Sequence, residues 1–142
     1  MRLFARKGFV LASLIVLTAC QMKPAEPKLS TSMRTSTKPE LAVAKIAKIA
    51  QKCWFKSGDK AFKQYRLANE VSSFAGQPRF LLVPRKNPGG LPLLVVQAVQ
   101  KGKTASGKFT NINAFGPLLQ SAHGKRILGD VNRWNKGDTK CS

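Results

Sequence analysis

The spacing of apolar residues in the first half of the folded region predicts a helix. Apolar side chains recur every three or four positions, which is typical of an amphipathic helix. These positions are Leu41, Ile46, Ile49, Ala50 and Cys53. The preceding tetrad Thr37-Lys38-Pro39-Glu40 matches a capping box with Pro in the first turn, and Ser57-Gly58 is a typical stop signal. We therefore expect one helix that begins near Thr37 and ends near Ser57.

After Gly58 the apolar period shortens toward two and turn-forming residues become frequent, which is typical of strands. Four strands are expected, near residues 62–69, 79–83, 93–100 and 108–113. The third is apolar on both faces, so we expect it at the centre of the sheet. The connections between consecutive strands are short, which favours an antiparallel meander because a parallel sheet would need crossover helices.

The C-terminal segment returns to helical spacing. Apolar residues at helical spacing lie between Pro117, which is typical of a first helical turn, and Gly124, which is typical of the end of a helix. The residues concerned are Phe115, Pro117, Leu118, Leu119, Ala122 and Gly124. A further short helix over residues 125–134 would bury Ile127, Leu128, Val131 and Trp134. The expected fold class is α+β: a small antiparallel sheet of about four strands, flanked by an N-terminal amphipathic helix and one or two C-terminal helices.

The first twenty residues follow a pattern of their own. Arg2, Arg6 and Lys7 precede an apolar run over residues 9–17, which leads into Leu17-Thr18-Ala19-Cys20. A run of this length is roughly half of what a membrane-spanning helix needs. The order of charged region, apolar region and small residues is typical of a signal peptide. Together with the tetrad, it resembles the lipobox signal of bacterial lipoprotein precursors.

The resemblance implies cleavage before Cys20, diacylglycerol on its thiol and an acyl chain such as palmitate on its amine. Gln21 stands in place of the Asp that resembles an inner-membrane retention signal, so the resemblance also implies an outer-membrane lipoprotein whose domain faces the periplasm. Two or three acyl chains anchor stably, since each buried methylene contributes about 0.8 kcal/mol. The alternative is an ordinary signal peptide cut near Ala19, which leaves Cys20 as a spare thiol.

Three regions follow from this interpretation. Residues 1–19 would be the signal peptide, residues 20–39 the lipidated Cys20 with a flexible linker, and residues 40–142 a single α+β domain. The linker is expected because Pro24, Pro27 and a cluster of Ser and Thr leave few large apolar side chains there. A chain of 142 residues leaves room for one domain.

Lipidation of Cys20 would leave an even pair of cysteines in a compartment where disulfides persist. Cys53 and Cys141 are therefore expected to form a disulfide that joins the first helix to the end of the chain. The alternative is a reactive, nucleophilic thiol.

Motifs for catalysis and metal binding are weak. Residues 102–108 fit the spacing G-x-x-x-x-G-K, but Phe109 stands where a phosphate-binding loop needs Ser or Thr for Mg²⁺, so we expect a basic hairpin loop. His123 is the only histidine and is expected at a helix C-terminus, where an imidazolium is favoured. Ser121 would not face it from two positions away. The carboxylates are scattered. We expect no catalytic residue, metal or cofactor, with a periplasmic hydrolase as the alternative function.

Charge is the strongest functional indication. The chain has 25 Lys and Arg against 6 Asp and Glu, a net charge of +19, and residues 40–142 carry 18 basic and 5 acidic residues, a net charge of +13. Such an excess costs stability through self-repulsion and favours an anionic partner. On the first helix, four lysines recur on one face. The anion-binding candidates are Lys45, Lys48, Lys52, Lys56, Arg85, Lys86, Lys101, Lys103 and Lys108.

These features predict a lipid-anchored, non-enzymatic envelope protein. Its partners would be the membrane, through the lipid anchor, and an anionic envelope polymer, lipid headgroups or an acidic protein. It could equally act as an accessory subunit of an outer-membrane assembly. Nucleic acid fits the charge but conflicts with the location, and the chain lacks interleaved exposed aromatics. For each single basic residue the alternative is a solvated surface charge.

Overall fold

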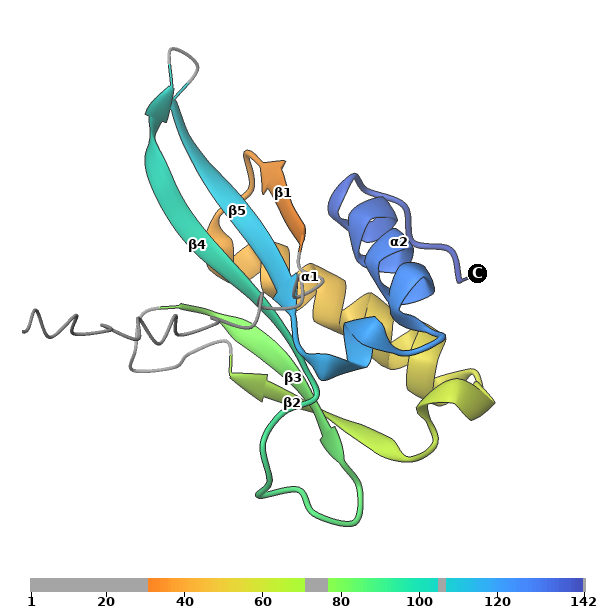
Figure 1. Ribbon diagram of the computed structural model, residues 1–142. Coiled ribbons are helices and arrows are strands. Elements are labelled where there is room, and N and C mark those ends of the chain that lie inside the picture. The colour runs from red at the N-terminus through yellow and green to blue at the C-terminus, as the bar shows by residue number, and fades with distance from the viewer. Residues whose placement is uncertain (1–30, 71–76, 105–106, 142) are drawn as a thin grey trace, which may run out of the picture.

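A five-stranded antiparallel sheet with helices on one side forms the fold (Figure 1). The computed structural model describes residues 31–70, 77–104 and 107–141. The strand order is β1-β5-β4-β3-β2, so β4 lies at the centre as predicted. The strands are β1 (Thr31–Thr35), β2 (Tyr65–Glu70), β3 (Arg79–Pro84), β4 (Leu94–Thr104) and β5 (Gly107–Phe115). The α+β prediction is confirmed, with five strands instead of four.

The helical elements lie before β2 and after β5. Helix α1 (Pro39–Ala50) continues directly into a π-helical turn, η1 (Gln51–Lys56), and a short 3₁₀ turn follows, η2 (Lys60–Phe62). After β5 come a 3₁₀ turn, η3 (Pro117–Gln120), and helix α2 (Gly124–Asn135). Helix α1 packs on the sheet, and α2 packs beside α1 and β1.

The additional strand, β1, lies in the segment expected to be linker. It pairs with β5, with Thr31 opposite Ala114 and Thr35 opposite Thr110. Its side chains alternate between half-buried and exposed, but Met33 is its one large apolar residue. An edge strand pairs with a neighbour on one side only and can be short and polar. Such a strand has no alternating apolar pattern from which it could be predicted. The folded domain therefore includes Thr31, nine positions before the predicted boundary.

The first helix differs from the prediction at its start and agrees at its end. Lys38 is the N-cap residue and its side chain makes no capping hydrogen bond, so the predicted capping box does not form. Leu41, expected on the buried face, is 61% exposed. The sheet-facing stripe begins one residue later, at Ala42. The helical segment ends at Ser57 as predicted, and its hydroxyl donates to the Cys53 carbonyl.

The β4–β5 hairpin is longer than expected, because β4 reaches Thr104 and β5 begins at Gly107. Residues 102–104 and 107–108 therefore belong to two paired strands, and β5 continues to Phe115 where a phosphate-binding loop would be followed by a helix. At the start of β2, Phe62 lies in η2 instead of in the strand and is fully buried.

The helix predicted over residues 125–134 is confirmed as α2, whereas the helix predicted between Phe115 and Gly124 is only the 3₁₀ turn η3. Two glycines make close backbone contacts in this region. A Cβ at Gly116, whose φ is +132°, would lie 2.5 Å from the Leu93 carbonyl oxygen. A Cβ at Gly124 would lie 1.7 Å from the Leu119 carbonyl oxygen. Gly124 therefore begins α2 instead of ending a helix, and Phe115 ends β5 with 38% of its surface exposed.

The core lies between the helices and the sheet, and Trp54 of η1 is at its aromatic centre. The Trp54 ring stacks on Phe62 at 4.7 Å between centroids and contacts Trp134 of α2 at 5.0 Å. All three side chains are fully buried. A smaller apolar cluster lies apart from this core and consists of Leu81, Val83 and Val95, with Ala68 packed against it.

The predicted disulfide between Cys53 and Cys141 is confirmed. It links the π-helical end of the first helix to the chain terminus across 88 residues of sequence. Cys53 is buried, whereas Cys141 lies at the surface. The bond therefore fastens the C-terminal segment after α2 onto the core.

Replacing both cysteines with Ala tests this contribution. Closing a loop of 88 residues restricts the unfolded chain, so we expect the free energy of unfolding to fall by up to about 4.5 kcal/mol. Urea denaturation of the oxidised protein and of Cys53→Ala/Cys141→Ala measures the difference, and the reduced wild-type chain is the control for side-chain effects. A loss below about 1 kcal/mol would show that the bond adds little to folding.

Candidate functional site

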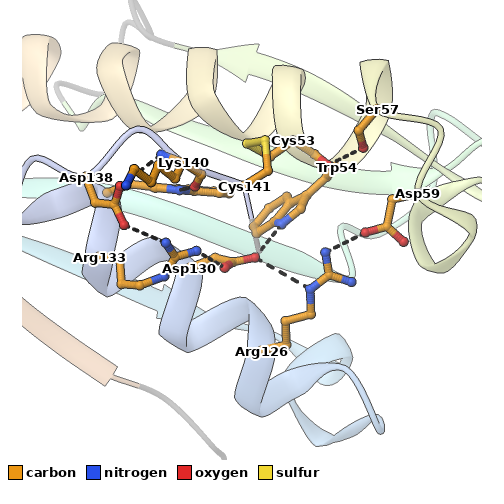
Figure 2. Close-up of a disulfide and its surroundings, with 11 residues drawn as sticks. Cys53, Trp54, Ser57, Asp59, Arg126, Asp130, Arg133, Asp138, Lys140 and Cys141 are labelled. Carbon is orange, nitrogen blue, oxygen red and sulfur yellow. Dashed lines mark hydrogen bonds and ion pairs between the residues drawn. A yellow bond between two sulfur atoms is a disulfide. The ribbon is translucent and has the colours of Figure 1, made fainter.

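A buried carboxylate lies next to the disulfide. Asp130 of α2 is 2% exposed and accepts a hydrogen bond from Trp54 Nε1 at 2.9 Å. It also accepts one from the Arg133 guanidinium at 2.7 Å and lies 3.8 Å from Arg126 Nε (Figure 2). A buried charge is costly unless it is paired and hydrogen-bonded. These contacts supply that pairing and connect α2 to η1.

The two arginines extend this contact into an alternating chain of charges. Arg126 pairs at its far side with Asp59, just before η2, and Arg133 pairs with Asp138, just after α2. Figure 2 shows the resulting series of three carboxylates and two guanidinium groups around the disulfide. We call Asp59, Arg126, Asp130, Arg133 and Asp138 the ion-pair chain. It ties Asp59, 67 residues away from Arg126, to α2 and to the segment that directly follows α2.

Hydrogen bonds to the backbone continue this chain toward Cys141. The Lys140 N–H donates to Asp138 Oδ1 at 2.9 Å, and Trp134 Nε1 donates to the Lys140 carbonyl oxygen at 3.1 Å. The last residues before Cys141 are thus fixed by α2 as well as by the disulfide. We conclude that this region holds the fold together.

The pKa values of the two terminal carboxylates reflect these contacts. Burial raises the pKa of Asp59, but hydrogen bonds from Arg126 and a backbone N–H outweigh it and hold that pKa below its usual value. The Lys140 N–H and the Arg133 guanidinium lower the pKa of Asp138. Both pKa values are lower in the folded chain, so the pairs stabilise it above about pH 4, the usual pKa of an unfolded Asp. This contribution is lost as the pH falls through the folded pKa values.

The single histidine does not form a catalytic pair with Ser121. The Ser121 hydroxyl donates to the Leu118 carbonyl oxygen and accepts from the backbone N–H of His123. His123 is exposed and directly precedes α2, so its predicted position at a helix C-terminus is wrong. Among the described residues, no group of three or more His, Cys, Asp or Glu is arranged to hold a metal ion.

Arginine is the cation in every ion pair of the described segments. Glu70 pairs with Arg79, and the other four ion pairs belong to the ion-pair chain. Four of the five described carboxylates are used in this way, and the fifth, Glu40, lies in the first turn of α1. Within the described part of the chain, no lysine forms an ion pair. The excess positive charge is therefore carried by the lysine ammonium groups together with three exposed arginines outside these pairs, Arg34, Arg66 and Arg85.

Four of the predicted lysines are brought together on α1 and η1. Lys45, Lys48, Lys52 and Lys56 are all exposed and line one groove of about 730 Å³. We call it the α1 groove. Its other described lining residues are Ala44, Ala47, Ile49, Gln51, Asn69 and Thr139. The groove thus combines four positive charges with apolar and neutral polar side chains, and none of these lining residues is acidic.

The other predicted anion-binding residues lie elsewhere. The Arg85 guanidinium donates to the carbonyl oxygens of Lys63 and Tyr65, so it fastens the loop after β3 to the segment that enters β2. Lys86 is exposed in the same loop. Lys101 and Lys103 lie on β4, and Lys108 lies on β5 and lines a separate hollow of about 370 Å³ with Glu40. Cys20 lies outside the described residues.

The sequence pattern gave no indication of the neutral part of the α1 groove. Asn69 comes from β2 and Thr139 from the C-terminal segment, and neither position is unusual in its local sequence. Ala44 and Ala47 could have been noticed, because small residues beside a lysine stripe leave room between the long side chains. The groove was missed because its walls are separated by many residues in the chain.

Comparisons with protein-family models, with curated protein sequences and with solved structures gave no match. In the described segments, no helix has both the length and the apolar character needed to cross a bilayer. Function must therefore be argued from the chain's own residues.

Removing the central carboxylate tests the structural role of the ion-pair chain. We expect Asp130→Ala to lower the free energy of unfolding by about 3 kcal/mol, because it leaves a buried indole N–H and two guanidinium groups without their shared acceptor. Urea denaturation at neutral pH measures the loss. Asp138→Ala is the matched control at the half-exposed end of the chain, and equal losses for the two variants would contradict the central position of Asp130.

Proposed function

We propose that this protein is a lipid-anchored, non-enzymatic envelope protein whose α1 groove binds an anionic component of the envelope. The lipid anchor is inferred from the lipobox that ends at Cys20. The binding role is inferred from the lysines of the groove. An outer-membrane location with the domain in the periplasm fits both features, because anionic headgroups and polymers are abundant there.

The observation that carries the proposal is the set of four unpaired ammonium groups along one helix face. Lysines three or four positions apart repel one another, at a cost of a few tenths of a kcal/mol per pair. Each side chain of this set is exposed, and the described carboxylates are held by arginines or lie in the first turn of α1. A bound anion would relieve the repulsion without rearranging the fold.

The tether keeps this groove close to the bilayer. Ten residues separate Cys20 from Thr31, the first residue of β1. Eleven steps along the chain span at most roughly 40 Å when extended. Lipid headgroups and any polymer near the membrane surface are therefore within reach of the domain.

Replacing Cys20 with Ser tests the anchor. Because a lipoprotein signal requires the cysteine thiol, we expect Cys20→Ser to block processing and to abolish the acyl modification seen in the mass of the purified protein. Wild-type protein should stay in the membrane fraction after a high-salt wash, since acyl chains hold it independently of charge. A Cys20→Ser protein with wild-type processing and membrane retention would refute the lipid anchor.

Charge reversal in the α1 groove tests the binding role. The chain from residue 21 to 142 keeps every described residue and can be secreted with its disulfide intact. We expect it to bind vesicles of anionic phospholipid, with affinity that falls steeply between about 50 and 200 mM salt because screening increases over this range. Lys48→Glu/Lys52→Glu should weaken binding at least about tenfold and leave thermal stability within about 0.5 kcal/mol.

A second double variant provides the matched control. Lys101→Glu/Lys108→Glu changes the net charge by the same amount, but both residues lie on the β4–β5 hairpin outside the α1 groove. It should lose much less affinity than the groove variant. Equal losses in the two variants, or binding that does not depend on salt, would show that the α1 lysines are an ordinary solvated face.

A further inference from the structure

The floor of the α1 groove is apolar. Its apolar lining residues are Ala44, which is exposed, and Ala47 and Ile49, which are 2% and 7% exposed, and we call these three the floor. The methylene stems of the four lysines add further apolar surface, because lysine keeps only its ammonium group in water. A ligand in this groove therefore contacts methyl and methylene groups along its length and positive charge at the rim.

A purely hydrophilic polyanion would gain free energy from the ammonium groups but not from the apolar floor. Phosphate or carboxylate groups would pair with the ammonium groups, but sugar hydroxyls placed on the alanine floor would lose hydrogen bonds to water without replacement. An acyl chain gains free energy from the same contact because it removes apolar surface from water. The volume of about 730 Å³ lies in the range of small-molecule sites.

We propose that the ligand of the α1 groove is an anionic lipid, with its acyl chain on the alanine and isoleucine floor and its headgroup among the lysines. This inference rests on the proposed function and specifies the kind of anion that the lysine face takes. The charge of the lipid is complementary to the rim, where the described lining residues include four ammonium groups and no carboxylate. Asn69 and Thr139, which also line the groove, supply neutral hydrogen-bonding groups for the headgroup.

The dependence of affinity on chain length is the direct test. The secreted chain of residues 21–142, which lacks Cys20, is titrated with octanoate, decanoate and laurate as monomers below their micelle concentrations, and calorimetry gives each dissociation constant. The carboxylate is the same in all three, so only the acyl chain varies. We expect affinity to rise about twofold to fourfold for each added methylene, since full burial of one methylene corresponds to about fourfold.

Two single variants on the exposed side of α1 locate the acyl chain. Ala44→Gln places a polar side chain on the floor at little cost in helix propensity, and we expect it to weaken laurate about tenfold. Leu41→Gln is the matched control, because it removes a 61% exposed apolar side chain of the same helix that does not line the groove. Laurate should bind this control as it binds the wild type.

Tripolyphosphate, a polyanion without an acyl chain, distinguishes a failure of this inference from a failure of the proposed function. If octanoate and laurate bind equally, or if Ala44→Gln leaves laurate binding unchanged, the acyl-chain site is refuted. Salt-dependent binding of tripolyphosphate that requires Lys48 and Lys52 would in that case leave the proposed function in place. If neither tripolyphosphate nor laurate binds, both proposals fail. Laurate affinity that survives Lys48→Glu/Lys52→Glu would also refute the inference, because the headgroup would then not lie among the lysines.

Discussion

The buried carboxylate of Asp130 is the contact on which the rest of the domain depends. It gathers Trp54 of η1 and two arginines of α2, and through those arginines it reaches Asp59 and Asp138. One carboxylate in the core thus connects η1 to α2 and, through Arg133 and Asp138, to the C-terminal segment. The disulfide joins the same two segments, η1 and the residues after α2. A covalent bond and ion pairs therefore stabilise the same part of the fold.

The same contacts determine how charge is distributed over the surface. Arginine suits a carboxylate because its planar guanidinium can donate several hydrogen bonds at once. In the described part of the chain, arginines hold Asp59, Glu70, Asp130 and Asp138. The lysines are therefore left facing water, and four of them share the α1 groove. The fold thus accounts for both the stability of a strongly basic chain and the presence of a surface suited to anions.

Periodicity was sufficient to predict α1, β3, β4 and the central place of β4, because these elements bury regular apolar stripes. The disulfide could be predicted because assigning Cys20 to the lipid anchor leaves two cysteines, Cys53 and Cys141. The local sequence pattern did not predict elements whose structure depends on contacts with residues distant in sequence. Ser and Thr in β1 become a strand only because β5 offers an edge, and position 116 requires Gly because its backbone lies against the Leu93 carbonyl oxygen. The stripe of lysines was visible in the sequence, but the groove and the pairing of Trp54 with Asp130, 76 residues apart, were not.

The central claim is that anions bind in the α1 groove and not over the whole basic surface. Amide chemical shifts of the isotope-labelled chain of residues 21–142, followed by NMR during a titration with laurate, test it most directly. The account predicts saturable shifts confined to Ala44–Lys56, Asn69 and Thr139, the segment and residues that contribute the groove. Shifts that are largest around Lys101 and Lys108, or that increase at all exposed lysines without saturating, would contradict it.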